Sequence, residues 1–338
     1  MQKTSVKWLA FIGLTFFVLG CSNPAEIISL SGNTMGTTYH IKVVPNEHLP
    51  EANLLQAEID LALEKVNDQM STYRPDSELS LFNSTGFEET VTVSADMATV
   101  IKEGIHLYQV TDGALDITLG PLVNLWGFGP DKRPTEIPSK EVVAEAKART
   151  GIEYLSVDGN RLGKTKGDLY VDLSSIAKGF GVDVIARILD QYHVTGYLVE
   201  IGGELSVFGD KMDGSAWRVA IEQPDVDDRE VQQVIAPGNM AIATSGDYRN
   251  YYEEDGRQFS HLIDPRTGYP IDHRLASVTV LHKECMIADG YATAMMVLGT
   301  EASLELAQRE GLAIMLIEKQ DTGFKVFYSD AFLPFVGL

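Results

Sequence analysis

The sequence is poor in cysteine, with only Cys21 and Cys285 among its 338 residues. One disulfide is the most that this number allows, and Cys21 belongs to an N-terminal export segment described below, so we expect none. Stability must then come from a hydrophobic core. A chain of this length with 44% hydrophobic residues is long enough to form one large core.

Positive charge is also scarce. The chain holds 27 Lys and Arg against 48 Asp and Glu, a formal net charge of -21. The first 20 residues contain two lysines and no acid, so the remainder has 25 basic and 48 acidic residues, a net -23. This balance argues against a nucleic acid partner. It would also repel a phosphate-bearing ligand, unless a divalent cation or a local cluster of Lys and Arg intervened.

Long hydrophobic runs are absent apart from residues 8–19, which are too few to span a membrane comfortably. Lys3 and Lys7 precede this run. The run ends in Val18-Leu19, and Gly20-Cys21 comes directly after it. The pattern resembles the lipobox of bacterial lipoproteins, in which the cysteine is acylated and becomes the mature N-terminus. We predict a lipoprotein signal peptide over 1–20, lipidated Cys21 with a tether over 21–31, and a folded domain over 32–338. A plain secretory signal with an incidental cysteine is the alternative, and both imply export.

The spacing of apolar residues predicts strands that cluster as hairpins, with helices between the groups. No internal repeat or low-complexity linker interrupts the pattern. We expect helices over 54–70, 94–112, 140–149, 176–192, 286–298 and 301–309, and strands over 33–44, 169–173, 196–201, 204–208, 217–222, 240–244, 258–263, 276–281, 313–318 and 325–329. This order favours an α+β fold of mixed antiparallel sheets with packed helices, in a single large domain of two intimately packed lobes.

One histidine stands directly before a rigid turn in residues 260–270, SHLIDPRTGYP. Pro265 and Gly268 indicate that this turn holds a defined backbone geometry. An imidazole titrates near neutrality and can accept a proton from a hydroxyl nucleophile, so His261 is a candidate general base. The alternative is an ordinary hydrogen-bonded histidine at a strand end.

Two helix starts could hold a ligand. Asp289 and Thr293 are four residues apart and share one helix face, where two oxygen ligands suit a hard cation such as Mg²⁺. An acid near a helix N-terminus with a packed threonine is the plainer alternative. Residues 172–181, DLSSIAKGFG, place hydroxyls and amides at a second helix N-terminus, which favours anions. Lys178 opposes the helix dipole there, so a phosphate or a neighbouring acid should accompany it; a simple serine cap is the alternative.

Two aromatic segments could bind a flat ligand: STYRPDSEL at 71–79 and GPLVNLWGFG at 120–129. Tyr73 lies beside a proline turn and can offer a ring face for stacking with little loss of entropy. Most Trp and Phe side chains are buried in cores, so we expect Trp126 and Phe128 there.

Taken together, eight ordered blocks resemble the ApbE family, the FAD:protein FMN transferases, over nearly the whole mature chain. They are MGTTY from Met35, STYRPDSELSLFN from Ser71, GALDITLGPLVNLWGFG from Gly113, DLSSIAKGFGVD from Asp172, IGGEL from Ile201, ATSGDYRNYY from Ala243, SHLIDPRTGYP from Ser260 and ADGYATAMMVLG from Ala288.

The resemblance implies a periplasm-facing lipoprotein of the bacterial inner membrane that binds FAD and uses Mg²⁺. It implies transfer of FMN onto a Thr or Ser hydroxyl of another exported flavoprotein, with release of AMP. The implied acceptors are subunits of sodium-translocating NADH:quinone reductase or Rnf-type complexes. Such a phosphoryl-group transfer depends on positioning and charge neutralisation. The cation would offset the repulsion between an acidic protein and the phosphates of FAD.

The resemblance also assigns roles to individual residues. It implies FAD contacts by Met35, by Tyr73 stacked on the isoalloxazine, by the strip Ala114, Leu115 and Asp116, and by Asp172, Lys178 and Ile263. It implies metal ligation by Ser175, Asp289 and Thr293, catalysis by Asp289 and by His261 as base, and lipidation of Cys21. Lys178 stands where other members can carry Glu. Glu200 stands where a small polar residue is expected, and no role is assigned to it.

Two further functions fit the same residues. Water could attack in place of the hydroxyl, which would make the protein a Mg²⁺-dependent FAD pyrophosphatase that yields FMN and AMP. A non-catalytic FAD-binding lipoprotein is the third possibility. It would need a stacking pocket and no metal, so the pair Asp289 and Thr293 counts against it.

Overall fold

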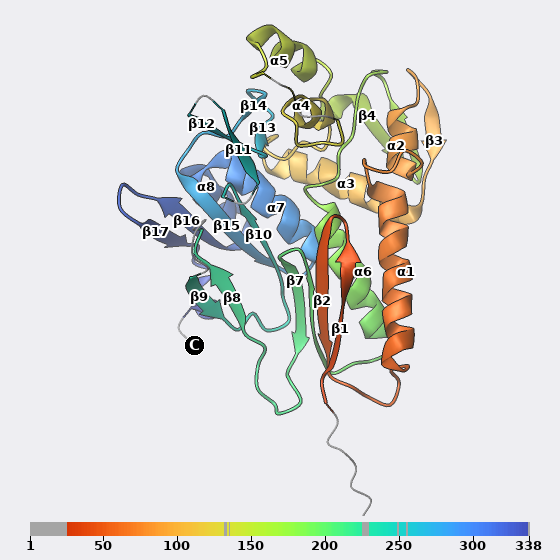
Figure 1. Cartoon of the computed structure of the whole chain (residues 1–338), viewed down its shortest axis with the longest axis vertical. Helices are drawn as coiled ribbons and strands as arrows, with labels where there is room; N and C mark the ends of the chain where they lie inside the picture. The colour runs from red at the N-terminus through yellow and green to blue at the C-terminus, as the bar shows by residue number, and fades with distance from the viewer. Residues whose placement is uncertain are drawn as a thin grey trace, which may run out of the picture.

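The structure is a computed structural model that describes residues 26–131, 134, 136–224, 230–248, 250–254 and 256–336 (Figure 1). The predicted signal peptide, the predicted lipidation site Cys21 and residues 22–25 lie outside this part of the chain. Among the helices that it includes, none combines the length and apolar character needed to cross a membrane.

An eight-stranded sheet forms the centre of the molecule, and every neighbouring pair in it is antiparallel. In spatial order its strands are β1 (Ile28–Thr34), β2 (Thr37–Val43), β6 (Gly196–Ile201), β7 (Glu204–Gly209), β10 (Ala241–Gly246), β15 (Leu275–His282), β16 (Ala313–Lys319) and β17 (Phe324–Tyr328). The sheet has one helical face and one face covered by strands, so the predicted α+β fold is confirmed.

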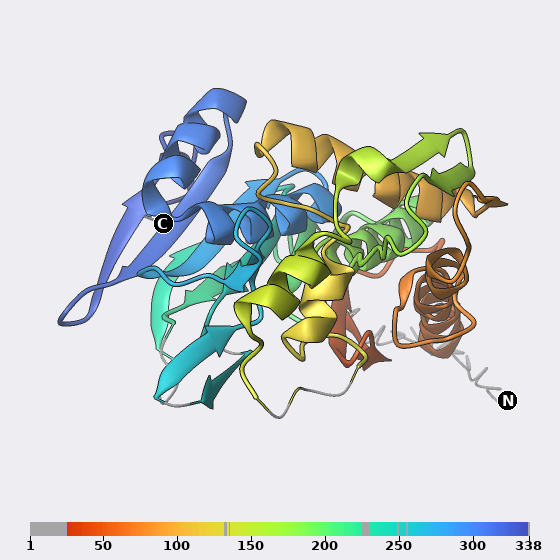
Figure 2. The same cartoon turned by 90° about the horizontal axis from the view of Figure 1, so that it is seen from above.

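The helical face of the sheet is covered by three main helices, α1 (Ala52–Met70), α6 (Ala177–Gln191) and α7 (Cys285–Leu298) (Figures 1 and 2). Two further helices pack against α7, namely α3 (Ala95–Val110) and α8 (Thr300–Glu310). The opposite face of the sheet packs against β8 (Val219–Glu222), β9 (Val231–Ile235) and the C-terminal residues around Phe332. The N-terminal parts of α6 and α7 lie side by side, because Gly179 of α6 packs against Cys285 at the start of α7.

Shorter elements form the upper part of the molecule in Figure 1. They are α2 (Glu78–Asn83), α4 (Gly120–Leu125), α5 (Lys140–Lys147), a sheet of β3 (Thr90–Thr92), β5 (Arg161–Lys164) and β4 (Leu155–Asp158), and two hairpins of β11 (Tyr251–Glu254) with β12 (Arg257–Ser260) and β13 (Ile263–Asp264) with β14 (Tyr269–Pro270). Single 3₁₀ turns lie at Ile152–Tyr154 and Leu333–Phe335. One apolar core runs from α3 and β4 to α7 and β16, so the two predicted lobes share a core.

Four predicted elements were wrong. The predicted strand over 258–263 is divided between β12 and β13, which belong to two different hairpins. The tether ends before Ile28, because residues 28–31 already pair with β2. The single strand over 33–44 is the end of β1 and all of β2, separated by a turn in which Met35 and Gly36 have positive φ values of 49° and 73°. Residues 169–173 form no strand. The Val171 N–H donates to Oδ1 of Asn83 and the Val171 carbonyl accepts from Nδ2 of Asn83, each at 2.8 Å, so this side chain takes the place of a strand partner.

The closest helix contact in the site region joins α6 to α7. A Cβ on Gly179 would lie 2.5 Å from the carbonyl oxygen of Cys285, so only glycine permits this separation. Asp183 of α6 then caps α7, because its carboxylate accepts from the amides of Cys285 at 2.8 Å and Met286 at 2.9 Å. Burial raises the pKa of Asp183 to about 6, against the effect of those two amide donors, which lower it.

We predict that Gly179→Ala destabilises the protein by about 2 kcal/mol, because the new methyl group must separate two helix backbones. Gly181→Ala is the matched control on the same helix. Its methyl group would meet the terminal Cε of Met35, at 2.8 Å, and that flexible side chain can move. Urea unfolding of both variants measures the difference, and equal stabilities would contradict this account of the contact.

Candidate active site

A pocket of about 710 Å³ lies at the start of α6, beside α7 and the middle of the central sheet. It is within the size range of small-molecule sites. The lining residues come from segments far apart in the sequence and include most of the predicted site: Tyr73, Ala114, Leu115, Asp116, Asp172, Ser175, Lys178, His261, Ile263, Asp289 and Thr293. Met35 is the exception, since it does not line this pocket and its methyl group packs against Gly181 of α6.

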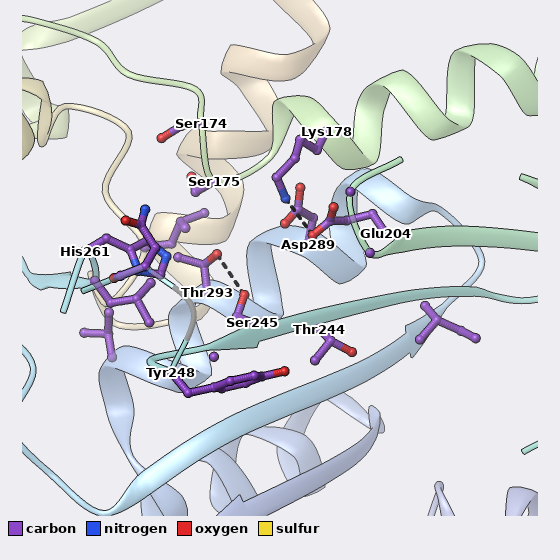
Figure 3. A pocket seen from close by; sticks show the side chains of 18 of the residues that line it. Ser174, Ser175, Lys178, Glu204, Thr244, Ser245, Tyr248, His261, Asp289 and Thr293 are labelled. Atoms are coloured by element: carbon purple, nitrogen blue, oxygen red, sulfur yellow. Dashed lines mark hydrogen bonds and ion pairs between the residues drawn. The ribbon is translucent and has the colours of Figure 1, made fainter. Parts of the chain in front are cut away.

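Asp289 and Thr293 lie on the pocket side of α7, one turn apart (Figure 3). Asp289 is 2% exposed, and its Oδ2 accepts from the Gly179 amide at 3.0 Å. Burial raises the pKa of Asp289, while Lys178 and that amide act to lower it. Asp183, and not Asp289, accepts from the first amides of α7, whereas Asp289 accepts from an amide in the first turn of α6. The Thr293 hydroxyl lies 3.4 Å from the Ser245 hydroxyl, so oxygen donors from α7 and β10 converge.

Lys178 is held by an acid that sequence inspection missed. Its Nζ lies 2.6 Å from Oε1 of Glu204, the first residue of β7. Burial acts to lower the pKa of Lys178, but the Asp289 and Glu204 carboxylates outweigh it and raise the value above the usual range, so the ammonium stays charged. The helix starts at Ala177 with no side-chain cap, so the serine-cap alternative is wrong. The Glu204 side chain is 4% exposed, and its Oε2 has no hydrogen-bond partner among the described residues.

A turn of two glycines positions Glu204. Gly202 and Gly203 have φ values of 59° and 109°, and both line the pocket. Glu200, to which no role had been assigned, holds this turn: its Oε1 accepts from the Gly203 amide at 2.7 Å, and its Oε2 lies 2.8 Å from Nδ1 of His40. The side chain of Glu200 therefore stabilises the β6–β7 hairpin that carries Glu204.

His261 lines the same pocket as Thr293 (Figure 3). Its Nδ1 lies 2.9 Å from the Asn250 carbonyl oxygen, which can only accept, so Nδ1 carries the hydrogen and Nε2 keeps its lone pair. Burial lowers the pKa of His261, and the Lys178 charge acts in the same direction, against the Asn250 hydrogen bond and Asp247. A neutral imidazole with a free Nε2 has the form that a general base requires.

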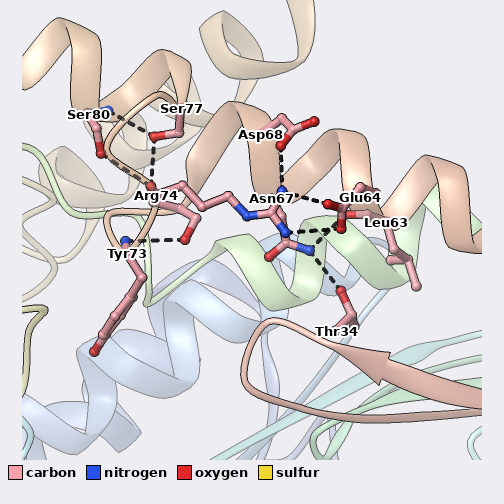
Figure 4. A network of polar contacts seen from close by, with 10 residues as sticks. Thr34, Leu63, Glu64, Asn67, Asp68, Tyr73, Arg74, Ser77 and Ser80 are labelled. Atoms are coloured by element: carbon pink, nitrogen blue, oxygen red, sulfur yellow. Dashed lines mark hydrogen bonds and ion pairs between the residues drawn. The ribbon is translucent and has the colours of Figure 1, made fainter.

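Tyr73 lies at the pocket mouth, with its ring 66% exposed and its hydroxyl donating to the Phe128 carbonyl at 3.2 Å. Figure 4 shows the loop that supports it, where Arg74 makes a two-pronged contact with Glu64, at 2.8 and 3.0 Å. The loop is closed further by Ser77, which donates to the Ser71 carbonyl at 2.7 Å. An exposed ring on a braced loop suits stacking.

Of the two aromatic residues predicted to be core, Trp126 is fully buried and donates to the Gly268 carbonyl at 2.9 Å. Phe128 is different, because it is only partly buried and lines the pocket. It stacks on Tyr252 and makes an edge contact with His261, with ring centroids 5.5 and 6.2 Å apart. The prediction for Phe128 was wrong, since composition cannot distinguish a pocket wall from a core.

The predicted FAD strip, Ala114 to Asp116, lines the pocket. Asp116 accepts from the amide and hydroxyl of Thr118, at 2.7 and 2.6 Å, while burial raises the pKa of Asp116 despite these bonds. Asp172 accepts from the Ser174 amide at 2.8 Å. Both carboxylates are thus oriented by their own loops and can accept hydrogen bonds from a ligand.

No group of three or more His, Cys, Asp or Glu side chains gathers closely enough to hold a metal ion in the part of the chain that the structure describes. The oxygen set around Asp289 therefore cannot be a cage made of protein carboxylates. It suits a cation that takes few protein ligands and completes its coordination with water or phosphate oxygens, as Mg²⁺ does.

Comparison with known proteins gives consistent matches. Residues 35–316 match the ApbE family. A relative named FAD:protein FMN transferase from Vibrio cholerae is 53% identical, over 98% of this chain and 99% of its own, and one from Haemophilus influenzae is 46% identical, over 98% of each. The solved flavin transferase ApbE from Vibrio cholerae superposes with a TM-score of 0.87, over 93% of this chain and 100% of its own, at 53% identity. The apo flavinyl transferase ApbE of Pseudomonas stutzeri gives 0.86, over 93% and 98%, at 42% identity.

We predict that Glu204→Leu costs about 2 kcal/mol of stability, because it removes the nearest partner of the half-buried Lys178. The double variant Lys178→Met with Glu204→Leu should recover most of this loss, since neither charge then remains. A double-mutant cycle in urea measures the coupling. Additive losses in the double variant would show that the two side chains do not act as a pair.

Proposed function

The chain belongs to the ApbE family, and from this membership we propose that it is an FAD:protein FMN transferase dependent on Mg²⁺. The observation that carries the proposal is the convergence of Asp289 and Thr293 of α7, Lys178 of α6 and His261 on one pocket. Transfer of a phosphoryl group between two large partners needs this combination of charge neutralisation, a base and a pocket for positioning.

Mg²⁺ fits the oxygen donors of the pocket. The Asp289 carboxylate and the Thr293 hydroxyl are hard ligands from one helix face, and Ser175 lines the pocket nearby. These three residues would hold the cation, which would neutralise the charge of the FAD pyrophosphate. Acidic side chains outnumber basic ones in the pocket lining, a balance that favours a cation. The acids are Asp116, Asp172, Glu204, Glu222 and Asp289, and the bases are Lys178 and Arg218.

The remaining chemistry belongs to the side chains of this chain. His261 would accept the proton of the acceptor hydroxyl at Nε2. A bond then forms between the hydroxyl oxygen and the FMN phosphorus, and the bond from that phosphorus to the bridging oxygen breaks, so that AMP leaves with the bridging oxygen. Lys178 would hold the phosphates, while Tyr73 would stack on the isoalloxazine. Ala114, Leu115, Asp116, Asp172 and Ile263 would contact the rest of FAD. The FAD contact of Met35 stays a prediction, since Met35 does not line the pocket.

The proposed acceptor protein and the proposed cellular location of the enzyme rest on the same family membership. We propose acceptors among exported flavoprotein subunits, such as those of sodium-translocating NADH:quinone reductase or Rnf-type complexes. The lipobox at Cys21 supports a lipid anchor that faces the periplasm from the inner membrane. This arrangement would keep the enzyme on the same membrane surface as its acceptors.

The direct test is mass spectrometry of a Thr-containing acceptor domain after incubation with residues 22–338, FAD and Mg²⁺. We expect an FMN adduct on one Thr, lost with chelator and lost in Asp289→Ala, whose fold should persist by circular dichroism. Free FMN and AMP with an unmodified acceptor would identify a pyrophosphatase instead. Unchanged FAD would leave a binding protein, and a fully active Asp289→Ala would reject the metal assignment.

The acid limb of the transfer rate should lie below pH 6.5, because burial lowers the pKa of His261 and a base acts in its neutral form. Activity therefore rises with pH through that lowered pKa and is near its full value at neutrality. We expect His261→Gln to remove this limb and to reduce kcat by about 100-fold or more. His273→Gln is the control, since that ring bonds the Met296 carbonyl at 2.8 Å, outside the pocket lining. An unchanged pH profile in His261→Gln would exclude the base.

A further inference from the structure

Strand β10 has a free edge inside the pocket. It pairs with β15 along its whole length, from Ala241 to Gly246, but with β7 only at Ala241 and Ile242. The reason is the hairpin tip of Gly202 and Gly203, where β7 begins. Beyond Ile242, β10 continues past the end of its neighbour, and the pocket is lined by both.

The direction of the backbone groups on this edge follows from two hydrogen bonds. The Met240 carbonyl accepts from Val207 on the β7 side, and the Asp247 amide donates to Ala276 on the β15 side. Since backbone groups alternate along a strand, Thr244 and Gly246 direct their N–H and C=O toward the gap beyond β7. In the described part of the chain these groups have no hydrogen-bond partner. The backbone groups of Thr244 and Gly246 therefore form a short strand edge that is not paired with a second strand.

Residues on both faces of the sheet line the pocket at this gap. Ile242 and Leu205 belong to the core on the strand-covered face, whereas Ser245 contacts Thr293 on the helical face. All four of these residues line the pocket, as do Arg218 to Glu222 along β8. A chain segment could therefore enter from the β8 side and reach the Asp289 region through the gap.

We propose that the polypeptide acceptor of the transferase adds here as a short extended strand, in line with β7 and antiparallel to β10. This deepens the proposed function and rests on it. The occupant is an extended peptide, because the free groups are alternating backbone donors and acceptors, which main-chain amides match. FAD has no repeating set of such groups.

The register of the added strand determines where its hydroxyl lies. Thr244 and Gly246 would form the hydrogen-bonded positions, so Ser245 would occupy a non-hydrogen-bonded position, where opposed side chains are closest. The side chain opposite Ser245 lies on the same face as Ser245. A Thr or Ser there would place its hydroxyl beside Thr293, on the face that carries Asp289 and His261 (Figure 3). The strand addition would thus present one acceptor residue to the site.

Disulfide trapping tests this register. Ser245→Cys in residues 22–338 should cross-link to an acceptor domain whose modified Thr is replaced by Cys, because such opposed positions have the short Cα separation that a disulfide needs. Thr244→Cys is the matched control: its side chain faces Thr279 on the other side of the sheet, at 2.9 Å between hydroxyls. We expect at least about tenfold more cross-link at position 245. Cys285 is fully buried and should not react.

Hydrogen exchange gives a second readout with the wild-type chain. The acceptor domain should slow exchange of the Thr244 and Gly246 amides by about tenfold or more, and FAD with Mg²⁺ alone should not. Slowing by FAD alone would assign the edge to the flavin and overturn the proposal. Equal cross-linking at 244 and 245, or none at either, would also overturn it. The wild-type FMN transfer assay is run beside both, so a failed transferase proposal is recognised separately from a failed docking proposal.

Discussion

The contact between α6 and α7 is the constraint on which the site depends. Gly179 lets the two helices approach until a Cβ no longer fits, and its amide donates to Asp289 across the contact. Asp183 ties the start of α7 to α6 in the same region. The predicted phosphate-binding Lys178 and the predicted metal ligand Asp289 come from elements more than 100 residues apart, and this contact brings them together. Their geometry is therefore as rigid as the helix pair itself.

A positive charge inside the pocket reduces the repulsion between this acidic protein and a phosphate ligand. The half-buried Lys178 lies 2.6 Å from Glu204, and the Asp289 and Glu204 carboxylates raise its pKa, so its charge persists. Glu204 has one oxygen without a partner among the described residues, and Asp289 lines the pocket beside it. Acidic side chains outnumber basic ones in the lining of the pocket. The proposed divalent cation would offset this excess, and its binding would then precede or accompany binding of the pyrophosphate.

Long periodic segments were predictable from the sequence, and short irregular ones were not. The helix over 94–112 was recognised from its Ser94 cap, which accepts from the Met97 amide at 3.2 Å. The strand over 169–173 was wrong, because Asn83 supplies its hydrogen bonds from a distant element. In the site, Asp289 and Thr293 share a helix face and could be paired from spacing alone. Glu204 could not, since a lone acid after two glycines carries no sign of the lysine that it meets.

The free edge of β10 also explains how an open strand can be tolerated. Exposed strand edges invite pairing with other chains, and proteins usually cover, shorten or charge them. This edge exposes the groups of only two residues, Thr244 and Gly246, and it is recessed in a pocket that the β6–β7 hairpin borders. The Tyr248 ring lies close over Gly246, where an added Cβ would be 2.5 Å from it. A sheet from another molecule cannot approach so recessed an edge, whereas a single extended segment can. In the proposed docking mode, the same restriction would admit one narrow, extended acceptor segment at a time.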